Sequence, residues 1–353
     1  MTSLRRNLDA SCLLLTVLFY CAAGSGVLAQ ADLGQPAQSR PLLLHQEAPA
    51  YPRLAQRAGE EGWVLLGFSI ETDGTVHDIV VIDSSDRYNR FSPAAKRALA
   101  KWVFEPPMVE GKPQKLSNQR QLISFALGGV KAPTEEFVRR YNDVIALIQA
   151  QDFSAARQAL SELHESQKAN LYEVNKLHVL DAYYHEAAGD FESARFALAR
   201  AVSGGRSFFP EQEYRALIRA YLERLIDAGH FASALSVFET VNEYERVRRD
   251  DPLRETISNI KALENSSQPF AVDATIPLEC NCDEPLYYYR PLRREFGVLD
   301  VSGRIDRMTL TCDSAYTTLD YEPGLSWSTP TQYGDCSLII YGEPGTTFKI
   351  VEY

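Results

Sequence analysis

Two runs of alternating residues, joined by a glycine turn, constrain the fold of this chain most strongly. Between Trp63 and Ile70 every second side chain is a large aliphatic or aromatic residue, which is the period of a β-strand with one buried face. Asp73-Gly74 follows shortly after, and this pair tolerates the positive φ angles of a tight turn between antiparallel strands. Apolar residues from Val76 to Ile82 continue the pattern. The stretch therefore predicts a hairpin whose first strand is half-buried.

A helix and a third strand complete this unit. Ser92-Pro93 is typical of a helix start, and an apolar stripe at steps of three and four residues runs on to about Lys101. Such a stripe needs a sheet to cover. Residues 121–125 alternate again and predict a last strand. A three-stranded sheet with helices on one face leaves that strand with a row of unpaired amides and carbonyls, to which a peptide can add.

The same stretch carries aromatic, glycine and proline residues at characteristic spacings. They are Tyr51-Pro52, Gly62-x-Val64, Phe68-x-Ile70-x-x-Asp73-Gly74-x-Val76, Trp102-x-Phe104-x-Pro106 and Gly111-x-Pro113. In these positions the chain resembles the TonB C-terminal domain, the energy transducer fold of the gram-negative envelope, over roughly residues 48 to 127. The resemblance implies a periplasmic module that captures the short TonB box of an outer-membrane receptor by strand addition.

The resemblance also suggests roles for individual residues. It implies that the motif residues are mostly scaffold, namely Tyr51, Pro52, Gly62, Asp73, Gly74, Trp102, Phe104 and Pro106. The partner-binding edge it implies is the last strand, with Arg120, Gln121, Leu122, Ile123, Ser124 and Phe125. Proline in place of Ile123 is expected to abolish peptide binding by removing an edge donor.

The N-terminal segment has the pattern of an export signal. Arg5-Arg6 precede an apolar run, and small residues follow up to Ala31, so we predict a signal peptide at residues 1–29 and a linker at 30–47. An uncleaved inner-membrane anchor is the alternative, because the apolar segment could just span a bilayer. Unlike the membrane helix of TonB itself, this segment has no histidine. The linker could extend only about 60 Å, which argues against direct energy transduction from such an anchor.

Three similar phrases mark the middle of the chain. Each has an alanine, a phenylalanine and a second alanine at fixed spacing, and the phenylalanines are Phe153, Phe191 and Phe231. This period of about 40 residues indicates stacked helix pairs, and it resembles tetratricopeptide repeats. We predict a TPR-like helical solenoid at residues 135–264, ending in a capping helix. Such a stack either offers a concave surface for protein–protein interaction or serves as a rigid spacer.

Strand-like runs replace helical periodicity from Ser266 onward. They predict a small antiparallel β-sandwich at residues 266–353, after a TonB-like domain at 48–130 and the helical repeats. Four cysteines lie in this segment, at Cys280, Cys282, Cys312 and Cys336, and an even count in an exported chain indicates two disulfide bonds. The pairing of Cys312 with Cys336 is favoured, which leaves Cys280 with Cys282. Crosswise pairings, which avoid the strain of that small ring, remain open.

The composition of the chain and the motifs that it lacks argue against several classes of function. The 353-residue chain has 36 basic and 47 acidic side chains, a formal charge of −11, so nucleic acid is not an expected partner. The sequence has no nucleophile elbow, phosphate-binding loop or zinc-protease motif, and we predict neither an enzyme nor a cofactor or metal. The expected class is multidomain α+β, and the expected protein is periplasmic, binding an outer-membrane receptor peptide in TonB-dependent transport. A non-transducing envelope scaffold or assembly protein is the alternative.

Overall fold

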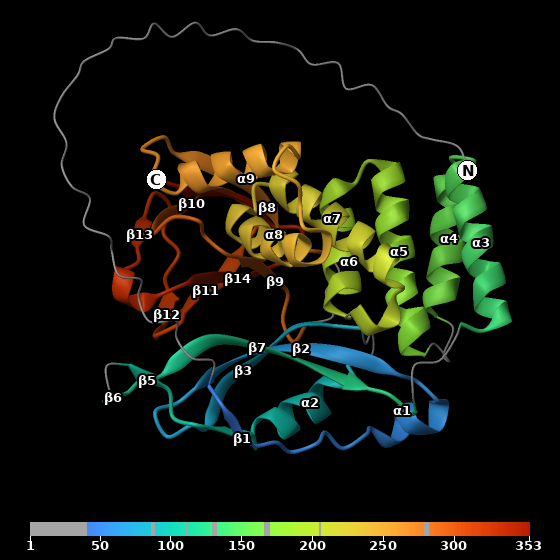
Figure 1. The fold of residues 1–353 in the computed structure, drawn as a ribbon, viewed down its shortest axis with the longest axis horizontal. Coiled ribbons are helices and arrows are strands. Elements are labelled where there is room, and N and C mark those ends of the chain that lie inside the picture. The colour runs from blue at the N-terminus through green and yellow to red at the C-terminus, as the bar shows by residue number, and fades with distance from the viewer. Residues whose placement is uncertain are drawn as a thin grey trace, which may run out of the picture. The chain divides into compact units, whose positions relative to one another are not determined.

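The computed structural model describes residues 41–85, 89–109, 112–128, 133–165, 170–204, 206–278 and 282–353. The predicted signal segment and most of the linker lie outside these residues. Within the described ranges, no helix combines the length and apolarity needed to cross a bilayer. The elements form three successive groups (Figure 1), which we call the N-terminal module (β1 to β7), the helix stack (α3 to α9) and the C-terminal sandwich (β8 to β15). The multidomain α+β class is confirmed.

The N-terminal module is built on an antiparallel sheet in the order β3-β2-β7. Helix α2 stops two residues short of the expected Lys101, and the last strand begins five residues before Gln121. Figure 1 shows α1 and α2 on one side of this sheet. The elements are β1 (Leu43–His45), α1 (Arg53–Ala58), β2 (Gly62–Ile70), β3 (Val76–Ser84), α2 (Ser92–Leu99), β4 (Val103–Phe104), β5 (Met108–Val109), β6 (Lys112–Pro113) and β7 (Leu116–Phe125).

The expectation of a half-buried first strand is wrong, because β2 is buried on both faces. Val64 and Leu66 pack with α1 and α2, as the alternation predicts. On the opposite face Trp63 is fully buried, and it packs against Leu171 and Val174 of the helix stack. A residue more than a hundred positions away therefore covers the face that the local pattern assigns to solvent.

The helix stack consists of helices that contact one another in chain order. Helices α4, α6 and α8 begin at the three repeated phenylalanines, and Ala156, Ala194 and Ala234 in their first turns are all fully buried. These small side chains let neighbouring helices approach closely, while Phe191 stays 53% exposed. The bounds are α3 (Glu135–Gln149), α4 (Phe153–His164), α5 (Leu171–Ala188), α6 (Phe191–Ser203), η1 (Arg206–Phe208), α7 (Glu211–Asp227), α8 (Phe231–Glu245) and α9 (Pro252–Leu263). Kinship with tetratricopeptide repeats stays a prediction.

The C-terminal sandwich packs two antiparallel sheets around one core. The sheet orders are β13-β10-β15-β8 and β12-β11-β14-β9, and buried side chains from both sheets, such as Phe296 and Met308, belong to the same cluster. The elements are β8 (Phe270–Thr275), β9 (Leu286–Tyr289), β10 (Glu295–Ser302), β11 (Ile305–Cys312), β12 (Ala315–Leu319), β13 (Ser326–Ser328), η2 (Thr331–Tyr333), β14 (Cys336–Gly342) and β15 (Thr347–Glu352). Strand β14 is buried on both faces, because Ile339 and Tyr341 on its outer side belong to a second buried cluster with Leu286.

The favoured disulfide is present, and it joins adjacent strands of the sandwich. Cys312 and Cys336 are directly opposite each other in the pairing of β11 with β14, and their sulfur atoms are bonded. Cys282 is also disulfide-bonded. Cys280 lies outside the described residues, so its predicted pairing with Cys282 stays a prediction.

Buried and interfacial hydrogen bonds tie the N-terminal module to the other two groups. Glu61 is 5% exposed, and its carboxylate accepts hydrogen bonds from the amides of Leu127 at 2.8 Å and Leu171 at 3.0 Å. Leu171 is the first residue of α5, where a carboxylate satisfies an amide that lacks a partner within the helix. On the sandwich side, Ser337 Oγ donates to Asn118 Oδ1 at 2.8 Å. These contacts hold β7 beside both neighbouring groups.

Candidate functional site at the outer edge of β7

Strand β7 lies at an edge of its sheet, with β2 as its one strand partner among the described residues. The hydrogen bonds that β2 makes with β3, on its other side, show which way the amides of β7 point. The carbonyl of Trp63 accepts a hydrogen bond from the amide of Ser85, and the Trp63 amide donates to Ser85 Oγ, so both groups point toward β3. Ser124, which is opposite Trp63 in the register, must therefore direct its own amide and carbonyl away from β2.

Backbone groups of successive residues in a strand point to alternate sides, so the directions at the other positions of β7 follow from Ser124. Arg120 and Leu122 have the same parity as Ser124, so their backbone groups also face outward. Ile123 pairs with Val64, whose backbone faces β7, and its amide belongs to the ladder within the sheet. The expectation that Ile123 supplies an outer-edge donor is therefore wrong, and Ser124 is the residue that tests this edge.

Part of the outer edge is already occupied by the protein itself. The amide of Ser117 donates to the carbonyl of Asp313, which lies in the turn between β11 and β12, at 2.6 Å. Side chains cover two outward carbonyls, because Gln119 Nε2 donates to the Ser117 carbonyl at 2.9 Å and Gln121 Nε2 donates to the Leu122 carbonyl at 2.8 Å. Each of these bonds occupies an acceptor that an added strand would otherwise use.

The six predicted partner-binding residues divide between the two faces and the edge. Ile123 and Phe125 are buried in the core on the α2 side. Leu122 packs on the opposite face with Trp63. Ser124 and Arg120 are exposed, and Gln121 is half-buried across the edge. The structure thus brings backbone of this segment to one edge, but it does not place all six side chains where a partner could touch them.

The motif residues contact the module's own framework. Asp73 Oδ1 accepts hydrogen bonds from the Thr75 amide and hydroxyl, and this interaction lowers the Asp73 pKa. Trp102 Nε1 donates to the Glu47 carbonyl at 2.9 Å, and Phe104 stacks on Phe68. The remaining positions are Tyr51, whose hydroxyl donates to the Glu60 carbonyl, Pro52 before α1, Gly62 against Phe91, Gly74 at φ 86°, and half-buried Pro106.

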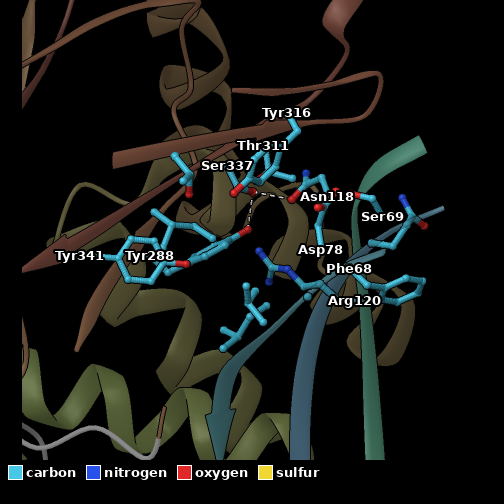
Figure 2. Close-up of a pocket in the computed structure, with 16 residues that line it drawn as sticks. Phe68, Ser69, Asp78, Asn118, Arg120, Tyr288, Thr311, Tyr316, Ser337 and Tyr341 are labelled. Atoms are coloured by element: carbon cyan, nitrogen blue, oxygen red, sulfur yellow. Dashed lines mark hydrogen bonds between the residues drawn. The ribbon is translucent and has the colours of Figure 1, made fainter. Parts of the chain in front are cut away.

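A pocket lies between the N-terminal module and the sandwich, next to Arg120. Figure 2 shows Arg120 on the side of β7, with Tyr288, Ser337 and Tyr341 facing it from the sandwich. The guanidinium carbon is 4.2 Å from the centre of the Tyr288 ring, in the geometry of a cation–π contact. Protein atoms crowd around Arg120, and burial, reinforced by the Arg290 charge, lowers its pKa to about 10. Its side chain still has solvent-accessible surface, because the pocket borders it.

No local signal in the sequence points to this pocket. Its walls come from strands separated by up to about 270 positions along the chain, including Gly67 of β2 and Tyr341 of β14. Gly67 belongs to the wall because it has no side chain, and a Cβ there would lie 3.1 Å from Val80. Within the described ranges, no group of three or more metal-ligating side chains is arranged to hold an ion.

The match to a known protein family lies in the N-terminal module. A family model described as the C-terminal domain of the Gram-negative bacterial TonB protein matches residues 47–127. Protein TonB of Pseudomonas aeruginosa is 42% identical over 69 residues, which are 20% of this chain and 20% of that protein. Protein tonB2 of the same organism is 43% identical over 63 residues, or 18% of this chain and 23% of the relative. The chain therefore spans about a fifth of the length of these curated relatives.

Solved structures of TonB domains are also similar to part of this chain. The solution NMR structure of the Pseudomonas aeruginosa TonB C-terminal domain is 32% identical to this chain, and the match covers 29% of this chain and 100% of that one, with a TM-score of 0.23.

Proposed function

We propose that this chain, whose residues 47–127 carry a TonB C-terminal domain, is a periplasmic protein that binds a peptide segment of an outer-membrane receptor. The domain match supports a role in TonB-dependent transport across the envelope. The peptide adds as a strand to the outer edge of β7. The mechanism is recognition, with main-chain hydrogen bonds for affinity and alternating side chains for specificity.

One observation carries this proposal. The outward amides of Arg120, Leu122 and Ser124 have no hydrogen-bond partner among the described residues. An added strand would supply carbonyls to these amides in the spacing that an antiparallel or parallel neighbour presents. Asp313 already accepts a hydrogen bond from the Ser117 amide at the start of β7. The open part of the edge is therefore short and begins at about Arg120.

Main-chain bonds alone account for only weak binding. A typical hydrogen bond contributes about 0.5 to 1.5 kcal/mol net, so four or five of them provide roughly 2 to 7 kcal/mol before any cost of ordering the peptide. Micromolar affinity needs about 8 kcal/mol. Side-chain contacts beside the edge must therefore contribute to the binding free energy. These contacts also determine which peptides the module binds.

The proposed edge is tested by replacing Ser124 with proline. Ser124 has an exposed side chain and an outward amide, so Ser124→Pro removes one edge donor and places a ring where the guest strand would pair. We expect at least tenfold weaker binding of a synthetic TonB-box peptide, measured by calorimetry. Ser124→Ala keeps the amide and is the matched control. Equal affinity for a folded Ser124→Pro variant, checked by circular dichroism, would exclude this edge as the binding surface.

The periplasmic location is part of the proposal and needs a separate measurement. The mass of the mature N-terminus separates a cleaved, free protein from one that keeps its N-terminal segment as an inner-membrane tether. A mature chain that starts near residue 30 supports the free form, and an intact N-terminus supports the tethered form.

A second candidate is a non-transducing envelope scaffold that binds other proteins through its helix stack. It is favoured by a groove of about 340 Å³ between α5, α6 and α7. Its floor includes Ala182 and Leu217, and acidic side chains including Glu223 lie along its wall. Under this alternative, Ser124→Pro leaves partner binding unchanged, whereas Leu217→Arg in the groove weakens it.

A further inference from the structure

Arg120 stands out among the cations around the pocket because it has no carboxylate partner among the described residues. Lys115 pairs with Glu71 and Asp78 at 2.7 Å each, and Arg307 pairs with Glu284 at 2.5 Å. Arg290, whose positive charge contributes to the lowered pKa of Arg120, pairs with Asp335 at 3.3 Å. The chain has an excess of eleven acidic groups, yet none of those in the described residues pairs with the Arg120 guanidinium beside this pocket.

The guanidinium is held so that its hydrogen-bonding edge stays free. Its central carbon lies 4.2 Å from the centre of the Tyr288 ring, and the Tyr288 hydroxyl is hydrogen-bonded to Ser337, which in turn is hydrogen-bonded to Asn118 (Figure 2). A cation–π contact uses the face of the guanidinium and leaves its in-plane N–H donors available. The network therefore orients Arg120 before any ligand arrives, which lowers the entropy cost of binding.

The size of the space and its guanidinium suit a carboxylate group, and the one acidic side chain in its lining, Asp78, is paired with Lys115. The pocket has a volume of about 30 Å³, enough for about two waters. A planar, bidentate partner is the best match for a guanidinium edge, and a carboxylate offers two oxygens at the required spacing. A bulky acid would not fit entirely, so the rest of the ligand must extend out of the pocket.

The geometry points to a carboxylate-binding site at Arg120. The carboxylate comes from an acidic residue of the guest strand or from a free small carboxylic acid. The first source rests on the proposed function, and it has a geometric basis, because β7 carries both the outward backbone groups of Arg120 and its side chain. In an antiparallel or parallel pair, the guest residue beside Arg120 would project to the same face, with its Cβ about 5 Å away.

The test uses matched peptides and matched variants of the full chain. The probes are capped heptapeptides rich in Val and Thr, with one Glu moved through alternate positions, and their Gln counterparts. The variants are Arg120→Gln and Arg120→Lys, where lysine keeps the charge but loses the bidentate fork. Arg97→Gln is the control, since Arg97 is exposed on α2, away from β7.

For one Glu position, we expect the native chain to bind the Glu peptide at least tenfold more tightly than its Gln counterpart. Arg120→Gln abolishes this ratio, Arg120→Lys reduces it, and Arg97→Gln leaves it unchanged. If Glu and Gln peptides bind equally at every position, or if the ratio survives in a folded Arg120→Gln variant, a guest acid at Arg120 is excluded.

A titration with sodium acetate distinguishes the second source and separates this inference from the proposed function. If no peptide binds, the edge hypothesis fails, but the carboxylate site still stands if acetate shifts the NMR signal of the Arg120 guanidinium saturably. Saturation at low millimolar acetate supports a site for a free acid. A linear, unsaturable shift, together with the absence of any preference for Glu peptides, overturns the carboxylate site altogether.

Discussion

The amide of Ser117 donates a hydrogen bond to the carbonyl of Asp313 at 2.6 Å, so the C-terminal sandwich occupies the start of the strand edge whose end is open. A guest strand of the kind proposed above would thus share one edge with the protein's own C-terminal segment without competing for the same residues. The boundary between them lies at the irregular register near Asn118, where φ is 56°. If a guest strand binds as proposed, the sandwich would limit how far it extends along β7.

Gln121, which covers part of the open edge of β7, should reduce the affinity of the module for a guest peptide. Gln121→Ala removes the side-chain donor to the Leu122 carbonyl and frees this acceptor for a guest. Since one hydrogen bond contributes about 1 kcal/mol, we expect peptide affinity to rise about fivefold, as measured by calorimetry. Gln119→Ala is the control, because its contact is at Ser117, where Asp313 already occupies the edge. Unchanged affinity for Gln121→Ala would show that the glutamine does not guard the edge.

The turn glycine should tolerate no side chain. At Gly74, φ is 86°, and a Cβ would lie 2.0 Å from the Phe104 carbonyl oxygen. Gly74→Ala should therefore lower the free energy of unfolding by more than about 2 kcal/mol, because steric overlap adds to the cost of the left-handed conformation. Gly59→Ala provides the comparison, since φ is 72° but nothing lies within 4 Å of its Cβ. Urea unfolding of both variants checks the difference, and similar losses would refute the role assigned to the Phe104 contact.

Stability should fall as the pH drops below the ordinary pKa of histidine. His230 is 3% exposed, with Nε2 2.8 Å from the Tyr287 hydroxyl, and burial, aided by the Arg195 charge, lowers its pKa to about 2. Below about pH 6.5 the unfolded chain binds a proton that the folded chain does not. This histidine thus contributes stability that is present above that pH and is lost at about 1.4 kcal/mol per pH unit below it, or roughly 2 kcal/mol by pH 5.

The measurement for this prediction is urea unfolding at about pH 7 and about pH 5. His230→Gln should make the pH dependence shallower, although stability at neutral pH also falls. Burial lowers the pKa of His178 as well, so the variant keeps part of the slope. An identical pH dependence in the parent and the variant would mean that His230 does not cause it.

The sequence alone determined the elements whose cause is local. Alternation and Asp73-Gly74 correctly predicted the β2–β3 hairpin, and Ser92-Pro93 correctly predicted the start of α2. Three repeated phrases correctly placed the starts of α4, α6 and α8, since a buried alanine recurs at the same step in each. These features depend on residues a few positions apart, whose geometry follows from backbone periodicity and turn chemistry.

Tertiary structure decided how much of β7 stays open and what lies beside it. The burial of Trp63, the contact from Asp313 to Ser117 and the pocket at Arg120 all join residues more than a hundred positions apart. Asn118 and Ser337, for example, are 219 positions apart and share one hydrogen bond. No period in a single sequence links such residues, because their proximity results from the packing of whole layers. The direction of each edge amide also depended on the register with β2, and a shift of one residue would have reversed it.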